Sequence, residues 1–193
     1  MKERLTLRNV IIWGAAFLAL LFFFLSFAAK AELSYADGGY EVSYHFRNAF
    51  WDAKVVEAYV NGVYQDGGTL PESKIFALPL IGLILVLVAA IGAVVCSFLI
   101  KDKKVLRIAL ISAGVLSITG GIFAFFVGET AARTFIYMMT GSLDNYDEVR
   151  QMLIDYGYHF GPRALAIIIG IVSILAGGAY GASTFLPEKK LVK

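Results

Sequence analysis

Two long apolar runs joined by a short charged connection constrain the fold of this chain more than any other feature. The runs extend over 75–100 and 105–127, and the connection between them reads Lys101-Asp102-Lys103-Lys104. A helix needs about 20 apolar residues to cross the roughly 30 Å hydrocarbon core of a bilayer, so each run is long enough to span it. Neither run contains a charged residue apart from Arg107, near the start of the second. The sequence therefore predicts a transmembrane helical hairpin.

Two further apolar runs, at 10–29 and 164–186, bring the number of predicted transmembrane helices to four. Hydrophobic residues make up 59% of the 193 residues, more than in a typical soluble domain. Ala29-Lys30-Ala31 also fits a signal-peptidase site, so cleavage of the first run is the alternative interpretation, although that run exceeds the usual length of a signal peptide's apolar region. We expect an all-α membrane protein, with one integral membrane domain over 1–193 built as a four-transmembrane-helix bundle.

The first long polar segment, 30–74, carries strand signals. Apolar and polar side chains alternate from Tyr40 to Phe46, which is typical of a half-buried strand. Asn61-Gly62 lies between two β-forming stretches, 55–60 and 63–65, and is a strong signal for a two-residue hairpin turn. Asp66-Gly67-Gly68 is expected to end the last strand. The sequence predicts a small antiparallel sheet of about three strands.

The second long polar segment, 128–163, is expected to be partly helical. Glu129 and Arg133 have helical spacing and are expected to pair, as the third helix continues toward Met139. Gly141 is expected to end that helix.

A short helix is predicted after this break. Ser142 or Asp144 is expected to cap it, and it should reach Asp155. The aromatic residues around Pro162 predict an interfacial belt before the fourth helix.

The distribution of Lys and Arg predicts the orientation of the chain. These residues are denser at both termini and in the connection between the second and third helices than in the two long loops, where the first loop holds seven acids against four bases. Cytoplasmic flanks carry the excess of positive charge, so both termini are expected in the cytoplasm and both loops outside. The basic residues at the termini are Lys2, Arg4, Arg8, Lys189, Lys190 and Lys193.

Small residues recur at a spacing of four in the predicted helices, which places them on one helical face. Such faces allow close approach of helices in a bilayer. The candidate packing residues are Ala109, Ala113, Ser117 and Gly121 in the third helix and Ser173, Gly177 and Gly181 in the fourth. Two interpretations stay open: these faces pack within the chain, or the fourth helix binds another subunit.

Ionisable groups give no indication of catalysis or of a cofactor. The middle of each apolar run has no charged residue or histidine, whereas coupled transporters usually bury one there. The two histidines, His45 and His159, lie in different loops, and the single cysteine lies in an apolar run, so we expect no metal site, catalytic residue or cofactor. Four basic residues are expected to attract lipid headgroups: Lys101, Lys103, Lys104 and Arg107.

The first outer loop is rich in aromatic residues, which are enriched at protein interfaces. The candidate partner surface consists of Tyr40, Tyr44, Phe50, Trp51, Tyr59 and Tyr64. The alternative is that they form the core of the loop domain and contact headgroups. The expected partners are the lipid bilayer and other membrane subunits or a second copy of the chain, and the small net charge of +2 gives no indication of nucleic acid.

The chain consists of a short basic N-terminus, a span, a longer β-rich outer loop, a hairpin of spans, a second outer loop, a span and a short basic tail. This layout resembles that of claudins and related tetraspan proteins, although Trp51 lacks the neighbours that the family's tryptophan has. The resemblance concerns topology, since the first loop lacks the family's paired cysteines and Gly-Leu-Trp sequence.

We expect a non-catalytic interaction protein of the cell membrane, an accessory or structural subunit of a larger complex. The alternatives are a transporter or channel component, and an enzyme acting on lipid or envelope precursors through Asp144, Asp147 and Asp155.

Overall fold

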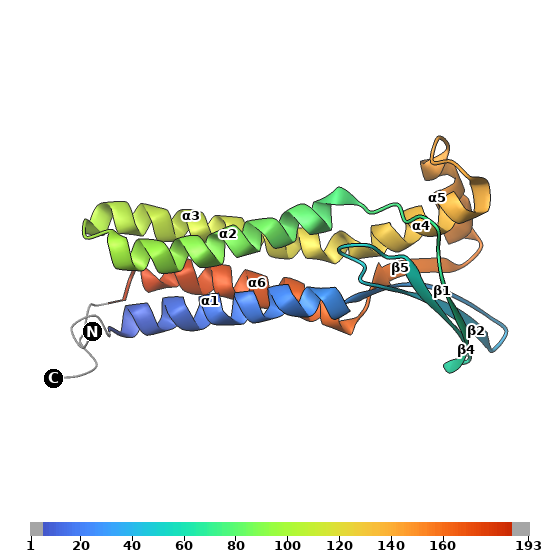
Figure 1. Ribbon diagram of the computed structural model, residues 1–193, viewed down its shortest axis with the longest axis horizontal. Coiled ribbons are helices and arrows are strands. Elements are labelled where there is room, and N and C mark those ends of the chain that lie inside the picture. The colour runs from blue at the N-terminus through green and yellow to red at the C-terminus, as the bar shows by residue number, and fades with distance from the viewer. Residues whose placement is uncertain (1–5, 187–193) are drawn as a thin grey trace. The chain divides into compact units, whose positions relative to one another are not determined.

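The computed structural model describes residues 6–186 and is mostly helical, with a small antiparallel sheet (Figure 1). Within these residues, four helices are long and apolar enough to cross a membrane. The chain forms two compact units. The helical unit contains the described residues up to 24, residues 81–123 and those from 169; the sheet unit contains residues 25–80 and 124–168. The expected cytoplasmic ends at Lys2, Arg4, Lys189, Lys190 and Lys193 lie outside the described residues.

The first, second and fourth candidate spans agree with the predicted runs to within a few residues at each end, and the third agrees at its start. Helix α1 covers Leu7–Leu25 and continues as a 3-10 turn over Ser26–Ala28. Helices α2 and α3 cover Ala77–Leu99 and Lys103–Ala124, and α6 covers Ala164–Ser183. Their long apolar runs account for their formation, because a helix satisfies its own backbone hydrogen bonds where no water is present.

The third helical run continues well past the predicted apolar segment. A 3-10 turn over Phe125–Val127 leads into α4, Gly128–Thr140, so the run from Lys103 to Thr140 has 38 residues. Gly141 ends it with a φ of +72°, and its N–H donates to the Tyr137 carbonyl. This left-handed conformation is easily adopted only by glycine. The predicted extension toward Met139 is confirmed.

Close backbone contacts at glycines hold the helical unit together. A Cβ atom added to Gly177 of α6 would lie 2.6 Å from the Gly114 carbonyl oxygen of α3, and one added to Gly121 would lie 2.7 Å from the Gly170 oxygen. On the other side of α3, a Cβ on Gly82 of α2 would lie 2.6 Å from the Gly120 oxygen. Only glycine permits helix backbones to approach this closely.

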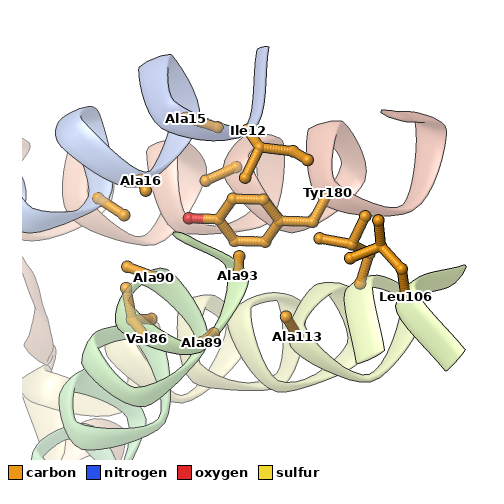
Figure 2. Close-up of a cluster of buried hydrophobic side chains, with 13 residues drawn as sticks. Ile12, Ala15, Ala16, Val86, Ala89, Ala90, Ala93, Leu106, Ala113 and Tyr180 are labelled. Carbon is orange, nitrogen blue, oxygen red and sulfur yellow. The ribbon is translucent and has the colours of Figure 1, made fainter. Parts of the chain in front are cut away.

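Alanines and one large aromatic side chain fill the centre of the helical unit. The Tyr180 ring is fully buried and lies among side chains that include Ala15 and Ala16 of α1 and Ala93 of α2 (Figure 2). Because α1 and α2 contribute mostly alanines to this core, beside Ile12 and Val86, a single tyrosine from a third helix fills the space that remains.

The sheet unit contains five strands in the order β4-β3-β2-β1-β5, each antiparallel to its neighbours. Their bounds are Lys30–Asp37 for β1, Tyr40–Arg47 for β2, Val55–Val60 for β3, Val63–Thr69 for β4 and Tyr158–Pro162 for β5. Asn61 and Gly62 have φ values of +49° and +76°, so the predicted hairpin turn is confirmed.

The sheet is larger than the three strands that the sequence predicts. Strand β1 precedes the predicted set, and β5 comes from the second loop, where an interfacial belt was expected. Gly67 and Gly68 lie within β4 instead of ending it. Helix α4 packs on β1 and β5, and α5, Tyr146–Asp155, packs beside them.

Asn145 precedes α5 and makes no side-chain capping bond, so the expected cap by Ser142 or Asp144 is wrong.

Candidate interaction site

The two faces of the sheet differ sharply in chemistry, because alternate residues of a strand point to opposite sides. The helix face contains apolar residues such as Leu33 of β1, which lies in register between Tyr44 of β2 and Phe160 of β5. The polar face carries Glu32 and His45, which are paired in register, together with a set of further charged groups.

His45 occupies the centre of the polar face and is buried, although the alternating pattern placed it on the polar side of a strand. Arg163 Nη1 lies 2.7 Å from His45 Nδ1 and also contacts Nε2. Glu32 Oε2 lies 3.6 Å from Arg163 Nε, and its other oxygen lies 3.9 Å from His45 Nε2. Burial, followed by the charges of Arg163 and Lys30, lowers the pKa of His45 to about 4. The ring is therefore neutral at pH 7, as it must be to accept a bond from Arg163.

Glu57 of β3 forms the second charged group on this face. Its carboxylate accepts a hydrogen bond from Lys30 Nζ at 2.5 Å and lies 3.6 Å from Arg47 Nη1. The Lys30 bond lowers the pKa of Glu57. A hollow of about 460 Å³ opens between these groups, lined by Lys30, Glu32, Glu41, Ser43, His45, Tyr59, Gly62 and Arg163.

The stability of the sheet unit is expected to fall as the pH is lowered from about 6.5 to about 4. In this range the unfolded chain binds a proton at His45 that the folded chain does not bind, so the free energy of unfolding decreases toward low pH. Because the buried imidazole borders the open hollow on the polar face, solvent screens part of this effect, and we expect a loss of roughly 1–2 kcal/mol. Thermal unfolding of the purified protein in detergent between pH 7 and pH 4 measures it.

The variant His45→Gln is the control for this pH dependence, since its amide accepts a bond from Arg163 but does not titrate. Its unfolding midpoint should change much less between pH 6.5 and pH 4. The same slope in both proteins would show that another group is responsible.

A row of neighbouring aromatic rings extends from His45 to the exposed edge of the sheet. The rings of His45 and Tyr59 lie 4.3 Å apart, and Tyr59 meets Tyr64 edge to face at 5.6 Å. Tyr64 belongs to β4, in which every residue is exposed. The opposite edge strand, β5, is shorter, ends at Pro162 and packs against α4 and α5. Edge strands are usually covered or guarded by charge or proline, and β4 carries only Asp66.

An apolar hollow lies on the helix face next to the same edge. Helix α4 packs on β1 and β5, and it covers the part of the helix face near β3 only partly, since every residue of β3 is half-buried. The hollow has a volume of about 350 Å³ and is lined by Tyr44, Phe46, Val56, Ala58, Asp66, Gly67, Gly68, Thr69, Leu70, Phe135 and Met138. The exposed edge and this hollow together form the candidate interaction site.

The predicted aromatic surface is divided among different places. Tyr64 on β4 and Tyr44, which lines the apolar hollow near Phe135, belong to the candidate site, whereas Tyr59 lines the hollow on the polar face. Tyr40 is 52% exposed, at the turn between β1 and β2.

Phe50 and Trp51 have structural roles instead. Phe50 is fully buried, so its assignment to an accessible partner surface is wrong. Trp51 stacks on Phe27 at 4.7 Å and donates its indole N–H to Ser26 Oγ at 2.9 Å. These contacts fix the loop that connects β2 to β3.

Glu129 makes different contacts from those predicted. It accepts a hydrogen bond from the Tyr146 hydroxyl and lies 3.3 Å from Arg150 Nε, so it ties α4 to α5. Burial and the bond to Glu129 raise the pKa of Tyr146. Arg133 lies over the rings of Phe76 and Tyr146, at 4.7 and 4.9 Å, in place of the expected pair with Glu129.

Most of the predicted packing residues lie between α3 and α6 of this chain. Ser117 donates to the Ser173 carbonyl at 2.7 Å, and both side chains are buried. Gly121 and Gly177 make the close approaches described above. Ala113 is buried, whereas Ala109 is half-buried and Gly181 has open space beside its Cα. Gly114 and Gly170 are the partners of Gly177 and Gly121 across this interface.

The remaining candidates lie elsewhere. Lys103, Lys104 and Arg107 line a pocket at one end of the helical unit, and Lys101 is exposed beside it. Asp147 and Asp155 border one open hollow on α5, while Asp144 borders another. Within residues 6–186 no group of three or more His, Cys, Asp or Glu side chains is placed to hold a metal ion.

No model of a known protein family matches the chain, and no curated protein shows detectable sequence similarity to it.

Proposed function

We propose that this protein is a non-catalytic interaction protein of the cell membrane, an accessory or structural subunit of a larger membrane complex. In this proposal the four apolar helices cross the bilayer, both termini are cytoplasmic and the sheet unit lies outside, where it binds the partner. The observation that carries the proposal is the uncovered strand β4, in which every residue is exposed and which borders an apolar hollow.

The chemistry on either side of β4 indicates what the partner should present. A strand that adds to a sheet edge bonds through its backbone and directs alternate side chains to opposite faces. On the helix face these side chains would enter the hollow beside Val56 and Phe135. On the polar face they would meet Tyr64 and the charged groups beyond it. The proposed partner is therefore another membrane subunit that offers an extended segment of alternating apolar and polar residues.

Site-specific cross-linking is expected to detect this partner at β4. Cys96 is the only cysteine, so a Cys96→Ser background allows single cysteines at Val63 and, as a control, at Gln151 on α5. In native membranes, position 63 should react with a membrane-impermeant maleimide added from outside. With a bifunctional reagent, it should also give an adduct that position 151 does not give. An adduct with the mass of two chains would identify the partner as a second copy.

The variant Gly68→Lys tests whether the edge itself makes the contact. A Cβ at Gly68 meets nothing within 4 Å, so the fold should accept lysine, and a lysine on an edge strand opposes further pairing. The adduct from position 63 should decrease at least about tenfold, whereas Gln151→Lys, with the same charge change, should leave it unchanged. A protein that stays monomeric and forms no adduct contradicts the proposal.

A further inference from the structure

One end of the helical unit contains a pocket whose charged lining residues are all cations. Figure 1 shows the start of α1, the connection from α2 to α3 and the end of α6 at this end. The pocket has a volume of about 370 Å³. We name it the basic pocket; it is lined by Arg8 of α1, by Lys103, Lys104, Leu106, Arg107 and Leu110 of α3, and by Thr184 and Leu186 after α6.

The orientation of the chain in a membrane does not require these cations to converge on one pocket. The positive-inside rule depends on how many Lys and Arg residues lie in a flank, not on whether they face one another. Lys101 satisfies that rule from an exposed position outside the pocket. By contrast, Lys104 and Arg107 border the same hollow, where like charges repel unless an anion lies between them.

The walls of the basic pocket are arranged to hold such an anion. The Arg107 guanidinium lies over the Phe185 ring, 4.7 Å from its centre, which restrains the long side chain at the pocket wall. Leu106 and Leu110 are buried beneath the charged residues and give the pocket an apolar floor. Thr184 also lines the pocket, and its hydroxyl donates to the Gly181 carbonyl at 2.7 Å, which fixes this side chain at the end of α6.

From this arrangement we propose that the basic pocket binds the phosphate group of an anionic phospholipid. Lysine and arginine recognise phosphate through charge-assisted hydrogen bonds, and basic pockets between transmembrane helices suit lipid headgroups. The apolar floor favours a lipid over a free phosphate ion, because it can cover the first carbons of an acyl chain. The site is separate from β4 and does not depend on the proposed partner.

Binding is tested on the full chain, purified in a neutral detergent. Phosphatidylglycerol, phosphatidylcholine with the same acyl chains, and inorganic phosphate are titrated separately, and bound lipid and the unfolding temperature are measured. We expect saturable binding of phosphatidylglycerol that weakens at high salt. Lys104→Gln should reduce its affinity about fivefold, and Lys101→Gln, an equal charge change three residues away, less than about twofold.

Both lysines are exposed, and Asp102 caps the backbone N–H of residue 104 at 2.8 Å in either variant, so folding should be preserved. If inorganic phosphate alone raises the unfolding temperature, and Lys104→Gln removes this effect, the pocket binds a soluble phosphate and the lipid assignment is overturned. Equal affinities for the two lipids, or equal losses in the two lysine variants, would overturn the site itself.

Discussion

Replacing Gly177 with leucine is expected to prevent the helical unit from folding. A Cβ at this position would lie 2.6 Å from the Gly114 carbonyl oxygen and 2.7 Å from Ile118 Cγ1, and the remaining leucine atoms would need still more room. A backbone oxygen cannot rotate away as a side chain can, so α3 and α6 must separate. We expect a loss of about 3 kcal/mol or more, at the upper end of the usual cost of overpacking.

The neighbouring residue provides a matched control for this substitution. A Cβ at Gly178 meets nothing within 4 Å, and this glycine is exposed on α6. Gly178→Leu gains the same helix propensity and the same apolar volume without the clash. Size-exclusion chromatography after detergent extraction should show a single folded species for Gly178→Leu and aggregate for Gly177→Leu. Equal behaviour of the two variants would show that α3 and α6 do not approach at these glycines.

The helices and part of the sheet could be predicted from the sequence because their signals are local. A run of apolar residues is sufficient to predict a spanning helix, and Asn61-Gly62 is sufficient to predict a hairpin. Strand β1 also carries such a signal, since Ala31, Leu33 and Tyr35 alternate with polar residues, although the predicted strands begin only at Tyr40. Strand β5 lacks one: it is five residues long and contains Gly161 and Pro162, which disfavour strands.

The candidate site was harder to predict because its contacts are long-range. Arg163 and His45 are 118 residues apart, and no local pattern indicates that β5 brings them together. The exposure of the aromatic residues also depends on long-range contacts: Phe50 is fully buried and Tyr64 is 56% exposed, although both are aromatic residues of the same loop. The small-residue spacing did indicate Gly121 and Gly177, but the identity of their partners depends on the relative rotation of the helices, which spacing alone does not give.

Substitutions of Tyr180 are expected to separate the effect of its ring from that of its hydroxyl. Tyr180→Ala should cost about 3–5 kcal/mol, because most residues of its cluster are alanines, whose short side chains cannot fill the cavity. The hydroxyl is buried and has no hydrogen-bond partner among residues 6–186, so it opposes folding in the helical unit. Tyr180→Phe should therefore be neutral or stabilise the protein by about 1 kcal/mol.

Thermal unfolding in one detergent measures the stability of the three proteins. Tyr180→Phe should be at least as stable as the unchanged protein, and Tyr180→Ala should be far less stable than both. Phenylalanine keeps the ring in the space between α1 and α2 that Figure 2 shows, so the pair of variants differs only in whether that space is filled. If Tyr180→Phe proves as unstable as Tyr180→Ala, the hydroxyl must bond to a group beyond the described residues. Packing by the ring would then not be the reason that a tyrosine occupies the centre of the alanine-lined core.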